Sequence, residues 1–213
     1  MYSGEVGELL FSWRSCESCG LHKNRKTPIH GGGNPSSKVV FVLDRTGPKS
    51  ASSGTPYSDL GGQVLQIMLE DLNLSSNDIW CTTPTLCPTK GAFETNFGRP
   101  LDTHPMPKAA ELEACRPRLH KEIELLQPKI TVACGANALK ALAIKNPPKY
   151  KESIGRVVEI DIQGSLVSYP IPVMVLPSLE MLARDGRQNS RDLWNKTTKQ
   201  IKTAIRLNSG EEK

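Results

Sequence analysis

The chain has 213 residues, of which 38% are hydrophobic, 5% aromatic and 23% charged. This ordinary globular composition excludes collagen-like, coiled-coil and wholly disordered chains, and the length suits one sizeable α/β domain, expected over residues 1–213. Lys and Arg number 27 against 22 Asp and Glu, so the formal net charge of +5 favours a polyanionic partner.

The cysteine content and the absence of long apolar runs indicate the compartment. No stretch approaches the roughly 20 apolar residues of a bilayer span, and no basic region precedes an apolar run at the start. Six cysteines are sparse for a secreted disulfide scaffold. We therefore expect a soluble, unprocessed monomer without a membrane partner, in a reducing cytoplasmic or nucleoid-associated compartment where metal ligation outranks disulfides.

Apolar periodicity predicts the secondary structure. In chain order it predicts a helix within 1–15, a strand at 38–43, a helix at 62–72, a strand at 78–81, a helix at about 108–126, a strand at 129–134, a helix at 136–143, a hairpin of 157–162 with 166–169, a core strand at 173–176 and a closing helix at 191–207. Residues 45–59 and 82–107 show no periodicity and are expected to be irregular. The alternation predicts a three-layer α/β/α sandwich with a central, mostly parallel sheet.

Four cysteines stand outside the apolar strands. Cys16 and Cys19 form a C-x-x-C pair, a spacing that lets two thiolates converge on one metal. The pair precedes the first strand, which disfavours thioredoxin-type redox chemistry. With Cys87 and Cys115 it supplies four thiolates for zinc or a four-iron, four-sulfur cluster, and spacing alone does not choose between these or scattered thiols.

Several motifs, in this order, resemble the iron-sulfur uracil-DNA glycosylases, the thermophile-type families of that superfamily. The resemblance covers residues from about 10 to 205. It rests on the following segments: Cys16-x-x-Cys19-x-Leu21 with Arg25, Gly31-Gly32-Gly33-Asn34-Pro35, Gly54-Thr55-Pro56-Tyr57, Cys87-Pro88, Ala114-Cys115-Arg116-Pro117-x-Leu119 and residues 129–138. It implies a uracil-DNA glycosylase-like fold and a four-iron, four-sulfur cluster on Cys16, Cys19, Cys87 and Cys115.

The resemblance also implies an activity. Such enzymes extrude a nucleotide from DNA, stack the base on an aromatic ring and hydrolyse the N-glycosidic bond. Where the family typically has G-E-A-P-G, residues 43–48 retain an acid at Asp44, which would orient water or assist the sugar cation. The alternative is that Asp44 caps the loop or pairs with Arg45. Tyr57 matches the stacking aromatic, with a core-edge aromatic as the alternative.

Two family positions are altered. Thr83 stands where the family has the Asn that reads the base edge, and its single hydroxyl replaces an amide that both donates and accepts. The family's last strand ends in a His-Pro whose His donates to the base oxygen, whereas residues 175–180 contain no His and Ser178 is the nearest match. These changes predict divergent or reduced excision of uracil or a modified base.

Basic residues near these motifs predict contacts to DNA phosphates, with solvated surface charge as the alternative. They are Lys23, Arg25, Lys26, Arg184, Arg187 and Arg191. The rival hypothesis for the whole chain is a catalytically silent iron-sulfur module that binds DNA or a protein partner with the same fold. A zinc-stabilised α/β protein unrelated to DNA is a third hypothesis.

Overall fold

A six-stranded sheet forms the centre of the computed structural model, which describes residues 4–89, 93–96, 99–102, 105–184 and 188–209. The strand order is β1-β3-β2-β6-β8-β7. Its strands are β1 (Gly32–Gly33), β2 (Val39–Val42), β3 (Trp80–Thr82), β6 (Ile130–Cys134), β7 (Val157–Gln163) and β8 (Ser168–Leu176). Strands β3, β2, β6 and β8 are parallel, whereas β1 and β7 pair antiparallel at the two edges. The predicted mostly parallel sheet is confirmed.

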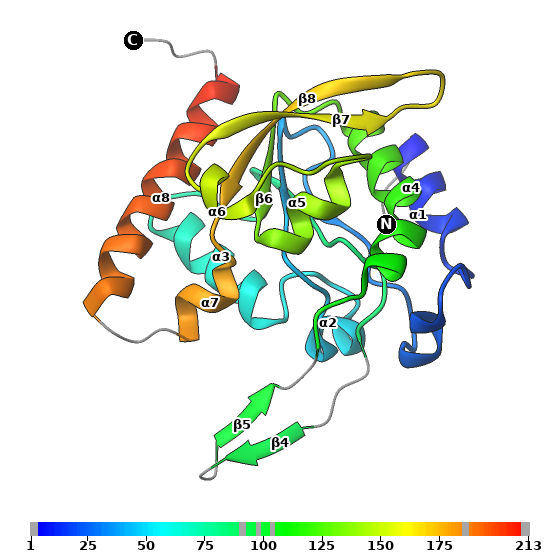
Figure 1. Ribbon diagram of the computed structural model, residues 1–213, viewed down its shortest axis with the longest axis horizontal. Helices are drawn as coiled ribbons and strands as arrows, with labels where there is room; N and C mark the ends of the chain where they lie inside the picture. Colours follow the sequence, from blue (N-terminus) through cyan, green and yellow to red (C-terminus); the bar gives the residue numbers. More distant parts are fainter. Residues whose placement is uncertain (1–3, 90–92, 97–98, 103–104, 185–187, 210–213) are drawn as a thin grey trace.

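Helices cover both faces of this sheet (Figure 1). The helices are α1 (Gly4–Ser12), α2 (Pro48–Ser53), α3 (Leu60–Glu70), α4 (Ala109–Leu126), α5 (Ala136–Leu142), α6 (Tyr150–Ser153), α7 (Leu179–Arg184) and α8 (Gln188–Ser209), with a short 3-10 turn, η1, at Gly20–Asn24. Side chains of α3, α7 and α8 share one buried cluster with one face of the sheet, and side chains of α4 and α5 share another with the opposite face. The three-layer α/β/α prediction is therefore confirmed.

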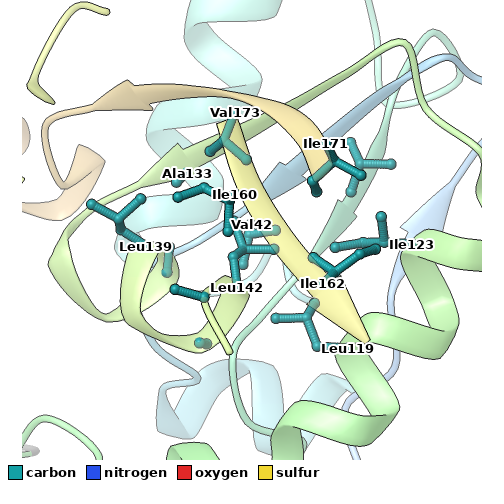
Figure 2. Close-up of a cluster of buried hydrophobic side chains, with 14 of the residues drawn as sticks. Val42, Leu119, Ile123, Ala133, Leu139, Leu142, Ile160, Ile162, Ile171 and Val173 are labelled. Atoms are coloured by element: carbon teal, nitrogen blue, oxygen red, sulfur yellow. The ribbon is translucent and has the colours of Figure 1, made fainter. Parts of the chain in front are cut away.

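The strand β2 shows why both faces are covered. Val39 and Phe41 belong to the cluster under α3 and α8, whereas Val40 and Val42 belong to the cluster under α4 and α5. Successive side chains of a strand point to opposite faces, so an all-apolar strand needs a helix layer on each side. Figure 2 shows the second cluster, in which Leu119 and Ile123 of α4 lie near β7 and β8 side chains.

Two segments expected to be irregular contain regular structure. Residues 48–53 form α2, with Pro48 at its first turn and Gly54 ending it at a φ of 76°, the arrangement of proline and glycine that commonly bounds a helix. The second segment contains a hairpin of β4 (Phe93–Asn96) and β5 (Arg99–Asp102), which extends from the body at the bottom of Figure 1.

The separate strands expected at 166–169 and 173–176 are wrong, because β8 runs unbroken from Ser168 to Leu176. Pro170 and Pro172 lie within it and face Asp161 and Glu159 of β7. A proline is tolerated in a strand where its missing N–H would face an unpaired edge. Strand β6 pairs only with residues 173–176 of β8, so the proline-containing half has a partner on one side alone.

Among the described residues, none of the helices is both long enough and apolar enough to cross a bilayer.

Candidate active site and cysteine cluster

The carboxyl ends of three parallel strands meet at one small pocket. Strand β2 leads into Asp44, β6 ends at Cys134, and β8 leads into Ser178, and all three residues line the pocket. The carboxyl edge of a parallel sheet is where open α/β folds place their ligands. Asp44 and Ser178, which the sequence proposed as catalytic, are therefore brought together from positions 134 residues apart in the chain.

The Asp44 carboxyl lies against the start of α5. Its Oδ1 accepts a hydrogen bond of 2.8 Å from the backbone N–H of Asn137. Burial raises the pKa of Asp44, an effect that the backbone N–H groups of Asn137 and Ala138 and the Ser178 hydroxyl partly offset, while Glu180 raises it further. Gly135 makes this approach possible, because an added Cβ there would lie 2.2 Å from the Asp44 carboxyl carbon.

Ser178 is 2% exposed, and its Oγ has no hydrogen-bond partner among the described residues. The hydroxyl lies beside the Asp44 carboxyl and lowers its pKa. A buried hydroxyl without a partner costs about 1–3 kcal/mol, so its place beside a carboxyl in a pocket suits a role toward water or substrate.

Arg45, considered from the sequence as a partner of Asp44, forms an ion pair with Glu180. Its Nε donates to Glu180 Oε2 at 2.8 Å and its Nη2 to Oε1 at 2.5 Å, a two-point ion pair that is nearly buried. Both side chains line the same pocket as Asp44. The pocket therefore holds a donor group and an acceptor group that the motif comparison did not assign.

Asp59 organises the loop between β2 and α3. Its carboxylate accepts the backbone N–H groups of Gly47, Lys49 and Ser50 at 2.9–3.1 Å. Position 47 requires a glycine because its backbone lies close to the Asp59 carboxylate, and an added Cβ would lie 2.3 Å from Asp59 Oδ1. Asp59 also lines the Asp44 pocket, so it fixes the α2 segment at the rim of the site.

Tyr57 and Thr83 lie outside the set of residues that lines the Asp44 pocket. Tyr57 is partly buried, donates its hydroxyl to the Gly32 carbonyl at 3.0 Å, and lines an adjacent open hollow with Lys49 and Ser52. The Thr83 hydroxyl donates to the Thr85 carbonyl at 2.9 Å and accepts from Thr46 at 2.8 Å. The Thr83 hydroxyl is thus hydrogen-bonded within the protein, and its role toward a base stays a prediction.

A buried network beneath Thr83 was missed by the sequence analysis. Arg118 donates to Glu122 at 2.5 Å, to the Thr82 hydroxyl at 2.9 Å and to the Thr83 carbonyl at 2.5 Å. Trp80 Nε1 donates to the other Glu122 oxygen at 2.7 Å. Arg118 and Glu122 are each 1% exposed, so this network fixes the segment after β3 to α4. Only their spacing of four residues on a predicted helix was visible in the sequence.

The four cysteines of the sequence prediction lie in one cluster. Cys87 and Cys115 are buried together with Leu21 and Leu86, and Cys16 and Cys19 pack against them. They come from the segment after α1, the loop after β3, and α4. In the described part of the chain, no group of three His, Cys, Asp or Glu residues is arranged to hold a single metal ion. Cys81 and Cys134 are buried in the sheet core, as expected.

Burial raises the pKa of the Cys87 thiol to about 11, although Arg25 lowers it. Arg25 lowers this pKa because its Nη1 donates a hydrogen bond to Cys87 Sγ at 2.8 Å. Its Nη2 donates to the Cys16 carbonyl at 2.6 Å. Arg25, predicted from the sequence as a phosphate contact, is therefore hydrogen-bonded within the cysteine cluster.

The other basic residues of that prediction remain at the surface or outside the described side chains. Lys23, within η1, and Lys26, two residues after it, are exposed. Arg184 ends α7 and Arg191 lies in the first turn of α8, with side chains outside those described. Arg187 lies outside the described residues.

Most of the chain is similar to proteins of one known family. A family model described as the uracil DNA glycosylase superfamily matches residues 30–202. The chain is 28% identical over 174 residues to a type-4 uracil-DNA glycosylase of Pyrobaculum aerophilum, covering 78% of this chain and 83% of that protein. It is 27% identical over 193 residues to a type-4 uracil-DNA glycosylase of Saccharolobus solfataricus, covering 90% and 82% of the two chains. The match takes in Asp44, Ser178, Cys87 and Cys115, and the chain belongs to the uracil DNA glycosylase superfamily.

Proposed function

We propose that this protein is a DNA glycosylase that hydrolyses the N-glycosidic bond of uracil or a modified base extruded from DNA. The observation that carries the proposal is the convergence of Asp44 and Ser178 in one pocket at the carboxyl edge of the sheet. The named activity of the type-4 relatives supports the same reaction class.

The pocket supplies what glycosidic cleavage requires. A water must be oriented near the sugar, and the departing base anion needs a donor or a positive charge. The Asp44 carboxylate, held in place by the N–H of Asn137, orients the water and offsets the charge of the sugar cation. The Ser178 hydroxyl is available as a donor to water or base because the described residues leave its Oγ unpaired.

In this proposal, the side chains of Arg45 and Glu180 recognise the base. An arginine only donates and a carboxylate only accepts, so together they complement a base edge that carries both a carbonyl and an N–H group. Uracil has such an edge. The guanidinium also places positive charge next to the departing base, while Tyr57, in the adjacent hollow, offers an aromatic ring for stacking.

The test is a base-release assay on duplex and single-stranded oligonucleotides that carry uracil, hypoxanthine or a modified pyrimidine, with alkaline cleavage of the abasic product. Asp44→Asn should lower release by about 10²-fold or more, the usual range for loss of an acid–base group. Asp161→Asn, at an exposed position of β7, is the matched control and should release base at the wild-type rate. Absence of product from every substrate, with DNA binding retained, would favour the catalytically silent module instead.

DNA binding is proposed to involve the exposed Lys23 and Lys26. Each phosphate contact contributes about 0.9 to the slope of log affinity against log salt on duplex DNA. Lys23→Gln should therefore weaken duplex binding uniformly across sequences and reduce that slope by about 1. An affinity that does not change with salt would contradict a phosphate-driven interface.

The cysteine cluster is proposed to hold a four-iron, four-sulfur centre on Cys16, Cys19, Cys87 and Cys115. A structural zinc needs its sulfurs about 2.3 Å from one ion, whereas each thiolate of a four-iron centre binds a different iron. The gathering of all four cysteines in one cluster, together with the resemblance to the iron-sulfur family, supports the second. Bound there, the centre would cross-link three segments and supply a one-electron redox couple. Iron and sulfide analysis of anaerobically purified protein tests this, and stoichiometric zinc without iron would refute it.

A further inference from the structure

Arg25 connects two segments of the chain that meet at the cysteine cluster. Its Nη1 donates to Cys87 Sγ at 2.8 Å, across 62 positions of sequence. Its Nη2 donates to the main-chain carbonyls of Cys16 at 2.6 Å and Arg14 at 3.3 Å. One planar guanidinium thus holds the C-x-x-C segment against the loop that carries Cys87.

The chemistry of this contact is specific to arginine. A guanidinium presents several N–H groups in a fixed plane, so it can serve a sulfur and two carbonyls at once, whereas a lysine ammonium is a single point on a flexible stem. The sulfur is buried among Leu21, Leu86 and Cys115. In such an apolar setting a charge-assisted hydrogen bond is stronger than at the surface.

We propose that Arg25 is a positioning residue for the cysteine cluster that sets the redox potential and the lifetime of the centre, and is not a DNA contact. This inference rests on the proposed iron-sulfur centre. Four thiolates give such a centre a net negative charge, and reduction adds another. A cation that donates to one of the sulfurs therefore stabilises the reduced form more than the oxidised form and raises the potential.

The experiment compares Arg25→Gln and Arg25→Lys with Arg14→Gln in anaerobically purified protein. Arg14 is an exposed arginine of the same segment, whose side chain lies over the Phe11 ring, so its variant removes an equal charge without touching a sulfur contact. The readouts are the midpoint potential from a dye-mediated titration and the rate at which the visible absorbance is lost in air.

Arg25→Gln should shift the potential to more negative values and speed the loss of absorbance by about tenfold or more, the scale of one charge-assisted hydrogen bond. Arg25→Lys should give a smaller shift in the same direction, because the charge stays while the planar fork is lost. Arg14→Gln should match the wild type in both readouts. If Arg25→Gln does not fold, the Arg25→Lys potential decides the matter.

Two results would overturn the inference. The first is an Arg25→Lys protein, or a folded Arg25→Gln protein, with the potential and lifetime of the wild type. The second is a reduction of the salt slope for duplex DNA by Arg25→Gln equal to that caused by Lys23→Gln, which would make Arg25 a phosphate contact. Wild-type protein without iron would end both this inference and the proposed centre, whereas a missing base-release activity with a normal potential shift would leave this inference standing.

Discussion

Gly135→Ala tests the geometry that places Asp44. Gly135 has a φ of 126° and a ψ of 172°, a region that is essentially restricted to glycine and costs other residues about 1–3 kcal/mol. The added Cβ would also lie 2.2 Å from the Asp44 carboxyl carbon and 2.3 Å from Oδ1. The carboxylate must then move away from the N–H of Asn137, and losing a hydrogen bond to a charged group costs about 1.5–3 kcal/mol.

The two effects together predict a loss of about 2.5–6 kcal/mol in the free energy of unfolding, against a total of about 5–15 kcal/mol for an ordinary domain. Urea unfolding followed by circular dichroism measures it, provided that the slope with denaturant is unchanged. Base release should fall as well, because Asp44 is displaced.

Gly61→Ala is the matched control for stability. Gly61 lies in the first turn of α3, with nothing within 4 Å of an added Cβ, so the same substitution should be neutral or stabilise by up to about 1 kcal/mol. A Gly135→Ala protein within about 0.5 kcal/mol of the wild type would refute the reasoning, since that is the size of an ordinary surface change.

Three further predictions concern α4. Leu119→Ala opens a cavity in a fully buried position of the core and should cost about 2–5 kcal/mol in urea unfolding, so a loss below 1 kcal/mol would count against the packing shown in Figure 2. Glu122→Leu leaves the Arg118 charge buried without its carboxylate and should cost about 3–5 kcal/mol, most of which the double variant with Arg118→Met should recover; no recovery would contradict the ion-pair explanation. Burial lowers the pKa of His120 below its ordinary value of 6.5, so the folded state binds fewer protons and stability should be complete above pH 6.5 and decline as the pH falls. His120→Gln should flatten that decline, and an unchanged pH profile would show that another group causes it.

The sequence predicted those parts of the fold that local periodicity specifies. The alternation of strand and helix identified the layers, and the apolar stripe from Val64 to Leu69 identified α3. It did not reveal α2, a six-residue helix without an apolar stripe, whose signals are only the flanking Pro48 and Gly54. Nor did it show that β8 continues through Pro170, because whether a proline faces an unpaired edge depends on where β6 begins.

The candidate site was likewise predictable from the sequence only in part. The order of the motifs in the sequence was enough to predict that the four cysteines lie together and to propose Asp44 for the site. The pairing of Arg45 with Glu180 was not found, because 135 positions separate the two residues and no local pattern joins them. The inward direction of Arg25 was also hidden, since a basic residue next to Lys26 looks the same in sequence whether it faces a phosphate or a sulfur.

The interior pair of Arg118 and Glu122 limits how this protein can change over evolutionary time. Replacing either residue alone would leave the charge of the other buried without a partner. Such a variant would fold poorly and be lost by selection. Homologous chains should therefore carry both residues or neither, and those with neither should show two uncharged side chains of matching size, with an altered partner for the indole N–H of Trp80.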